Sequence, residues 1–182
     1  MRRSLLAAAL LSATLAACNG QGPSAPATGD ASSATAAASE ADAKFADLSK
    51  RALAGWLQLH PVAATQIGEH RYDAEVDDLS AAGRQKIIDF TNKMLAELDG
   101  IDATRLSREN QIDALLLRNQ LKSDLWGVQT YRSWAWDPQD YSSLAGGAIY
   151  NLMAREFAPM PQRLKSATAR MQKIPQIFAQ MR

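Results

Sequence analysis

The chain has 182 residues, with 20 Lys and Arg against 19 Asp and Glu, and a formal net charge of +1 at pH 7. Basic and acidic residues are interspersed along it, so the sequence lacks the basic stripe that binds nucleic acid, and we exclude nucleic acid as a partner. Cys18 is the only cysteine, so no intramolecular disulfide can form and a folded domain here must depend on a hydrophobic core.

The first 17 residues have the organisation of a bacterial export signal. Arg2 and Arg3 precede an apolar run over Leu5–Leu11, which continues through small residues to Cys18. The run is shorter than the roughly 20 apolar residues that a spanning helix needs, and its end in small side chains is typical of a processing site. We therefore predict a signal peptide over residues 1–17.

The last four residues of this region, Leu15-Ala16-Ala17-Cys18, resemble the lipobox of bacterial lipoproteins. The resemblance implies a diacylglycerol on the Cys18 thiol and cleavage just before it. It also implies anchoring in the cell envelope, facing the periplasm and on the outer membrane, so the membrane is a predicted partner. Cleavage would remove Arg2 and Arg3 and no acidic residue, which lowers the net charge from +1 to −1. The alternative is an ordinary secretory signal with an incidental cysteine.

Residues 18–43 are predicted to be the lipidated cysteine and a disordered linker. Gly, Pro, Ser, Thr and Ala dominate this stretch, and such side chains bury too little apolar surface to offset the entropy of ordering. The alternative for the end that joins the next element is an alanine-rich helix over Ala34–Ala43.

Residues 44–182 are predicted to form a helical domain. Phe45, Leu48, Ala52, Trp56 and Leu59 recur at steps of three and four, which indicates a helix over about 42–59.

Further helices are expected along the chain from their capping residues. Pro61 can open a short helix that Gly68 ends, Ser80 can cap a helix that stops at Gly100, and Ser107 can cap a third helix. The third helix carries a broad apolar surface, which we expect to contact more than one neighbour.

The remaining segments are also read as helices separated by breaks. An aromatic loop is expected over 131–141, a helix after Gly146-Gly147, and a last helix interrupted by a kink or restart at Pro175. The last helix has one apolar stripe, made of Leu164, Ala167, Met171, Ile174, Phe178 and Met181. No run alternates with period two, so the predicted fold class is all-α, a bundle-like array of several helices. No stop signal follows the stripe, which predicts that the chain is truncated.

Scattered motifs in this domain resemble one bacterial family of unknown function, number 885. The motifs are His60-Pro61-Val62-Ala63-Ala64-Thr65-Gln66-Ile67-Gly68, Tyr72-Asp73, Leu79-Ser80, the Asp113–Leu121 helix, Trp136-Asp137-Pro138-Gln139-Asp140-Tyr141 and Phe157-Ala158-Pro159. The resemblance implies a larger, mostly helical protein that is often secreted or lipid-anchored. It also implies similarity to zinc metallopeptidases, because the family carries a His-Glu-x-x-x-x-His-His-like segment in its C-terminal half.

The chain itself lacks that zinc motif. No His-Glu pair occurs, and the two histidines, His60 and His70, are ten positions apart with no shared helical face. We predict no catalytic residue and no metal ligand here, and expect zinc only in the C-terminal part of the family. As an isolated chain it is expected to be inactive.

An aromatic group is the candidate contact for a peptide or sugar. Trp134, Trp136 and Tyr141 could line a substrate groove, although aromatic residues in helical proteins are more often core. The favoured function is the N-terminal helical part of an envelope-anchored, zinc-peptidase-like hydrolase with a peptide-like substrate. The alternative is a complete, non-enzymatic periplasmic lipoprotein that binds a partner or acts as a scaffold.

Overall fold

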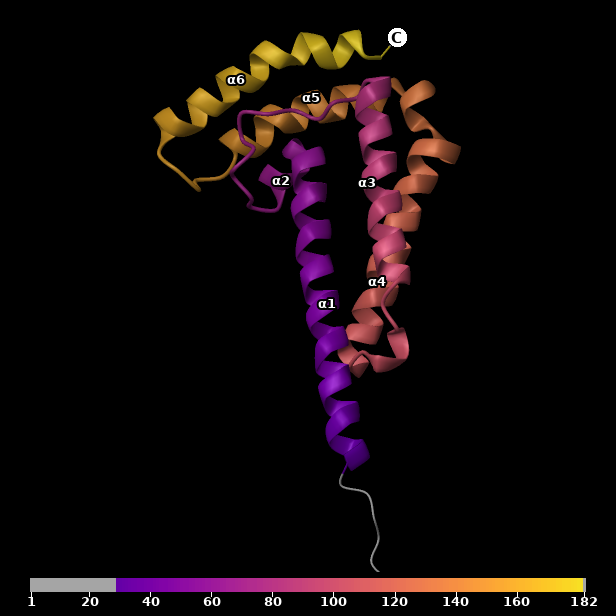
Figure 1. Ribbon diagram of the computed structural model, residues 1–182. Coiled ribbons are helices and arrows are strands. Elements are labelled where there is room, and N and C mark those ends of the chain that lie inside the picture. Colours follow the sequence, from indigo (N-terminus) through magenta and orange to yellow (C-terminus); the bar gives the residue numbers. More distant parts are fainter. Residues whose placement is uncertain (1–28, 182) are drawn as a thin grey trace, which may run out of the picture.

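The computed structural model describes residues 29–181, and all regular structure within them is helical (Figure 1). The six α-helices are α1 (Gly29–Leu59), α2 (Pro61–Gln66), α3 (Ala81–Asp99), α4 (Arg108–Trp126), α5 (Pro138–Met153) and α6 (Met160–Ala179). Three shorter elements are η1 (Ala103–Arg105), the π-helix η2 (Gly127–Tyr131) and η3 (Ser133–Ala135). The predicted all-α class is confirmed. The predicted signal peptide and Cys18 lie outside the described residues.

The helices form two parts. Helices α1, α3 and α4 run lengthwise beside one another, while α5 and α6 lie across one end of them (Figure 1). The short helix α2 joins the parts, because it packs against both α1 and α5. None of the helices between residues 29 and 181 combines the length and apolarity that crossing a bilayer requires.

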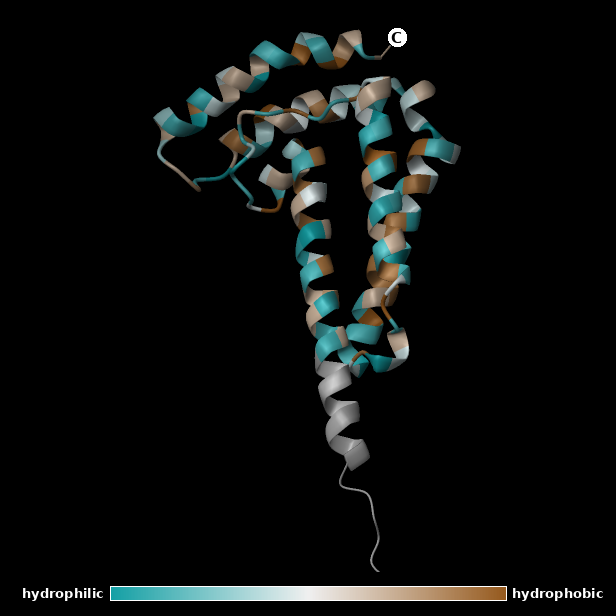
Figure 2. Cartoon of the chain, in the orientation of Figure 1, coloured by the Kyte–Doolittle hydropathy of each residue, from teal (hydrophilic) through white to brown (hydrophobic). Residues whose placement is uncertain are grey.

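The hydrophobic core of the lengthwise helices contains the first three residues of the stripe predicted for α1, while Trp56 and Leu59 are only partly buried. Phe45, Leu48 and Ala52 of α1 are buried against Leu98 of α3 and Leu121 of α4. Each helix contains both apolar and polar residues along its length (Figure 2). A helix of this composition can bury one side and expose the other.

Several predicted helix ends are confirmed by their capping contacts. The Ser80 hydroxyl accepts a hydrogen bond from Gly83 N at 3.0 Å, and Ser107 accepts one from Asn110 N at 3.3 Å. Gly100 caps the end of α3, and Gly68 follows α2 with a φ of 94°, a left-handed conformation that favours glycine. The contacts that cap these helix ends involve only residues a few positions apart in the sequence.

The start of α1 corrects one prediction. The helix begins at Gly29, not near Asp42, so residues 29–43 are helical where a disordered linker was expected. Alanine has the highest helix propensity, so an alanine-rich segment can extend a helix that tertiary packing already stabilises. The weighed alternative, a helix over Ala34–Ala43, lies within the observed element.

The segment after α4 differs from the predicted aromatic loop. It contains η2 and η3, and α5 already begins at Pro138 because the Asp137 carboxylate caps it, accepting from Gln139 N at 2.9 Å. Gly146 and Gly147 therefore lie inside α5 and do not precede it.

Of the kink or restart expected at Pro175, the restart does not occur, because α6 continues through that residue as one helix. Helix α4 packs against both α1 and α3, which confirms that its apolar surface contacts more than one neighbour, although Leu115 and Leu116 are 67% and 63% exposed.

A substitution at Gly83 tests how closely the connection between α2 and α3, residues 67–80, approaches α3. A Cβ atom there would lie 1.9 Å from Asp78 O, so Gly83→Ala forces backbone to move and should cost about 1–3 kcal/mol of unfolding free energy. Gly146→Ala is the matched control, because a Cβ there meets nothing within 4 Å and alanine should stabilise α5 by roughly 0.5–1 kcal/mol. Thermal unfolding measures both, and equal melting temperatures for the two variants would contradict the close approach.

Candidate functional site

The connection between α2 and α3, residues 67–80, is held by a buried arginine of α6. The side chain of Arg170 is 0% exposed. Its Nε donates to Glu75 O at 2.8 Å, its Nη1 to Ala148 O at 2.9 Å, and its Nη2 to Pro61 O at 3.0 Å. A guanidinium presents five donors in one rigid plane, so this single side chain joins the connection, α5 and α2 to α6.

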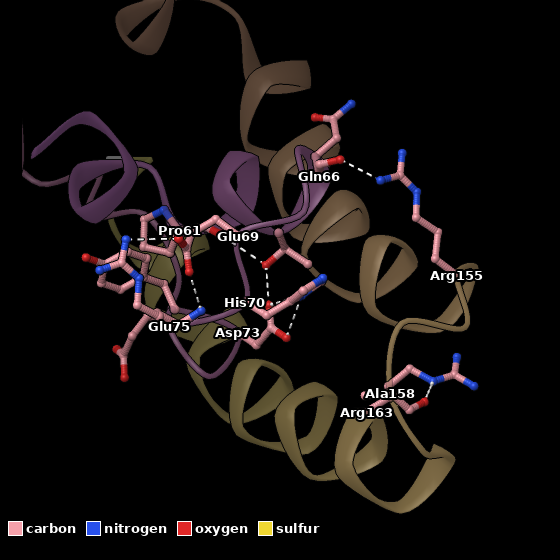
Figure 3. Close-up of polar contacts among 12 residues, drawn as sticks. Pro61, Gln66, Glu69, His70, Asp73, Glu75, Arg155, Ala158 and Arg163 are labelled. Atoms are coloured by element: carbon pink, nitrogen blue, oxygen red, sulfur yellow. Dashed lines mark hydrogen bonds and ion pairs between the residues drawn. The ribbon is translucent and has the colours of Figure 1, made fainter. Parts of the chain in front are cut away.

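A line of polar contacts continues from that arginine to the surface. The Thr65 hydroxyl accepts from Arg170 Nη2 at 2.7 Å and donates to Asp73 Oδ1 at 2.7 Å. His70 Nδ1 lies 3.0 Å from Asp73 Oδ2, and the two side chains face one another in Figure 3. Because a carboxylate only accepts, Nδ1 carries the proton in this contact. The His70 ring also stacks on Phe157, with centroids 3.7 Å apart.

The charge of Arg170 is compensated inside the protein. Burial lowers the pKa of its guanidinium from the ordinary value because water no longer solvates the charge, while the carboxylates of Asp73, Asp77 and Glu75 oppose that shift. An arginine stays protonated under such conditions. The buried cation is therefore satisfied by carbonyl acceptors and nearby carboxylates.

A second buried arginine, Arg163, holds the turn between α5 and α6. Its Nε donates to Ala158 O at 2.9 Å, as Figure 3 shows, and its Nη1 donates to Met153 O at 3.0 Å. Arg163 donates to backbone carbonyls and Arg170 donates to backbone carbonyls and the Thr65 hydroxyl, so the two arginines form a structural frame for this region.

The residues between 40 and 181 do not form a zinc site. His60 Nδ1 lies 3.4 Å from Asp77 Oδ1, and His70 contacts Asp73, so each histidine is paired with its own carboxylate. No group of three His, Cys, Asp or Glu side chains in this described range is arranged to hold a metal ion. Zinc catalysis needs about three ligands and an open position, so these residues do not fit the metal that the family resemblance implies.

The three aromatic residues expected to line a groove do not share a surface. Tyr141 is 2% exposed and its hydroxyl donates to Trp134 O at 2.8 Å. The Trp134 ring lies between two guanidinium groups, with Arg84 at 3.7 Å and Arg132 at 4.9 Å from its centroid. Of the three, only Trp136 is largely exposed.

Trp136 belongs instead to a different aromatic group beside the π-helix η2. Its ring meets Tyr131 edge-on at 5.3 Å, and Tyr131 stacks on Trp126 at 5.2 Å. Arg132, directly after η2, is a non-glycine residue with a φ of 53°, which places some strain in this turn.

A cleft between α1, α3 and α4 is the best candidate for a ligand site among the described residues. It consists of two adjoining hollows of about 330 Å³ and 290 Å³ that share Trp56, Gln120 and Asp124. Leu53 and Leu117 add apolar walls to the larger hollow. Small-molecule sites are typically apolar hollows of this size with a few polar groups, so the cleft fits that description.

Asp124 is the charged group in this cleft. Burial raises the pKa of its carboxyl above the ordinary value, and the hydrogen bond from Gln120 Nε2 at 2.8 Å and the nearby His60 only partly oppose the shift. Asp124 forms no ion pair with a lysine or arginine of the described chain. Perturbed carboxyls in clefts are candidate functional groups.

Neither Arg170 nor Asp124 is among the residues predicted to form a site, although the sequence contains a signal for each. Asp124 follows Leu117 and Leu121 at steps of four and three, so it lies on the core side of α4. Arg163 and Arg170 flank Ala167 in the same way on α6. A charged residue at core spacing indicates a buried charge that needs a partner.

The fold and the cleft define an all-α protein with a structural arginine frame and an open interhelical site. The chain belongs to the family described as bacterial protein of unknown function (DUF885), whose sequence profile matches residues 61–182. The structure is similar to that of a candidate lipoprotein of unknown function from Shewanella oneidensis, with a TM-score of 0.70 and 34% sequence identity. That match covers 75% of this chain and 25% of the Shewanella chain, so this chain spans about a quarter of its relative's length. A comparison with curated proteins gives no significant match.

Arg170→Met tests the structural frame. The substitution keeps an unbranched side chain but removes the donor to Glu75 O and the cation that the carboxylates of Asp73 and Asp77 face, so we expect a loss of about 3–5 kcal/mol in unfolding free energy. Arg155→Met is the matched control, because Arg155 is exposed and donates only to Gln66 O, and its effect should stay within about 0.5 kcal/mol. Urea unfolding measures both. A loss below about 1 kcal/mol for Arg170→Met would show that the fold does not depend on this contact.

Proposed function

We propose that this chain is the N-terminal helical part of a zinc-peptidase-like hydrolase that is anchored to the cell envelope through Cys18. The observation that carries the proposal is an apolar strip on α6. Five large residues of α6 and the turn directly after it are 41–59% exposed; they are Met160, Leu164, Met171, Phe178 and Met181, and we call them the α6 strip.

The α6 strip has the geometry of a helix contact surface. Leu164, Met171 and Phe178 follow one another at intervals of seven, so they lie on one side of α6. The adjoining side of α6, which carries Arg170 and Ile177, is buried in this chain. A continuous apolar strip of this kind is typical of a surface that another element covers.

The family match supports the proposal that another part of a larger protein packs on the α6 strip. The chain corresponds to only a quarter of the Shewanella relative, which leaves most of that protein to pack on it. In the proposed hydrolase, zinc would be bound by that remaining part, and the helices described here would shape one wall of the substrate channel. Of the aromatic residues predicted to contact a peptide substrate, Trp136 has the exposure to do so.

The proposed envelope location depends on Cys18. The lipobox-like Leu15-Ala16-Ala17-Cys18 and the description of the Shewanella relative as a lipoprotein both support a lipid anchor. In this proposal the helical domain faces the periplasm, attached to the outer membrane by the lipid.

A second candidate is a complete, non-enzymatic periplasmic lipoprotein that binds a partner or acts as a scaffold. The observation that favours it is the internal core of α1, α3 and α4 together with the Arg170 frame, since both are satisfied by residues of this chain. The two candidates differ in whether the α6 strip is covered by the same polypeptide.

Cys18→Ser tests the anchor. Without the thiol no diacylglycerol can be attached, so the protein should move from the membrane fraction to the soluble fraction and lose the mass of the lipid. Ser24→Ala, six residues further along, is the matched control and should leave the protein in the membrane fraction. Fractionation and intact mass measure the outcome. Membrane attachment that survives Cys18→Ser would disprove lipid anchoring at this residue.

Polar substitutions in the α6 strip test the larger hydrolase. In the product of the complete gene, Leu164→Gln with Met171→Gln should cost about 1–3 kcal/mol per residue, because each amide would be buried under the covering element. In the isolated chain the same pair should change stability by less than about 0.5 kcal/mol each, because both residues are exposed there. Denaturant unfolding of the two proteins measures the difference.

Leu115→Gln with Leu116→Gln is the matched control on α4 and should be nearly neutral in both proteins if only the α6 strip is covered. The coding DNA beyond Arg182 provides an independent check. An open frame that reaches a His-Glu-x-x-x-x-His-His-like segment supports the hydrolase, and a stop codon without that segment would rule it out in favour of the scaffold.

A further inference from the structure

Asp124 is unusual among the acidic residues of the structure because its burial disfavours the charged form. Other acidic side chains with perturbed titration, such as Asp42, Glu69 and Asp102, have a lowered pKa because hydrogen bonds stabilise the carboxylate. Asp124 has one such bond, from Gln120, and its second oxygen has no hydrogen-bond donor among the described residues. One oxygen of this half-buried carboxylate is therefore open to a cation in the cleft.

The walls around Asp124 suit an apolar group that carries such a cation. The Trp56 ring lines both hollows of the cleft, and Phe90 and Leu121 line the larger one. A cation near the face of a tryptophan is attracted by the ring quadrupole, while the aliphatic and aromatic walls favour an apolar body. The lining therefore combines the two surfaces that an organic ammonium ion needs.

A second polar atom in the larger hollow is also without a partner. The Ser49 hydroxyl is buried and makes no hydrogen bond in the described chain. Ser49 lines the same hollow as Asp124, and buried polar atoms are almost always hydrogen-bonded in folded proteins. The larger hollow is thus lined by two residues with a polar oxygen that has no donor or partner among the described residues, Asp124 and Ser49.

We propose that the cleft between α1 and α4 binds a small organic amine, with the ammonium group on Asp124 and the apolar body against Trp56. The chemistry is that of a primary ammonium ion on a short aliphatic or aromatic group, which occurs both in free amines and in lysine side chains of peptides. This inference does not depend on the proposed hydrolase, because every residue involved lies in the described chain.

The test is a binding titration of the mature protein with phenethylamine, followed by tryptophan fluorescence. Asp124→Asn removes the charge and keeps the shape, so it should weaken phenethylamine binding about tenfold or more, the range for a hydrogen bond to a charged group. The neutral analogue 2-phenylethanol should bind the wild type and Asp124→Asn equally and weakly. Trp56→Phe should reduce the fluorescence change on binding. Because Trp56 lines the cleft, that reduction would show that the ligand binds there.

Asp89→Asn is the matched control. Asp89 accepts from Gln85 at 2.8 Å with the same spacing of four residues, but on the exposed side of α3, so this variant should bind phenethylamine like the wild type. A lysine-containing tripeptide compared with phenethylamine distinguishes the two sources of the ammonium group, and tighter binding of the tripeptide identifies a peptide ligand. The proposal is overturned if the wild type shows no saturable binding, or if Asp124→Asn binds phenethylamine as tightly as Asp89→Asn does.

Discussion

The position of α6 depends on the buried guanidinium of Arg170, and much of the second half of the fold depends on α6. Arg170 donates to carbonyl oxygens of α2, α5 and the 67–80 connection, so one side chain joins three elements to α6. Its removal would take away these charged hydrogen bonds and leave the nearby carboxylates of Asp73 and Asp77 without their cation. The apolar residues of α6 do not replace this anchor, because the largest of them lie on the exposed α6 strip.

Frame and cleft are therefore physically different parts of the molecule. In the frame, the guanidinium groups of Arg163 and Arg170 donate hydrogen bonds to backbone carbonyls, so these donors are already used within the protein. In the cleft, Asp124 keeps a carboxylate oxygen without a donor, and its burial opposes ionisation. Natural proteins accept such unfavourable groups mainly where function requires them, which is why the cleft and not the frame is the candidate site.

Membership of the DUF885 family places these helices in a larger context. The chain spans a quarter of its Shewanella relative, and the α6 strip presents the kind of surface on which further helices pack.

The sequence by itself determined the features that depend on neighbouring residues. The all-α class, the caps at Ser80 and Ser107 and the glycine after α2 all involve contacts within a few positions, so their residue types predicted them correctly. Composition was less reliable at the start of α1, where alanine-rich sequence is compatible with both linker and helix. Only the tertiary structure decided the roles of Arg170 and Asp124. The carbonyls that Arg170 binds lie up to 109 residues away, and the burial that perturbs Asp124 comes from the packing of separate helices, so no local pattern contains either environment.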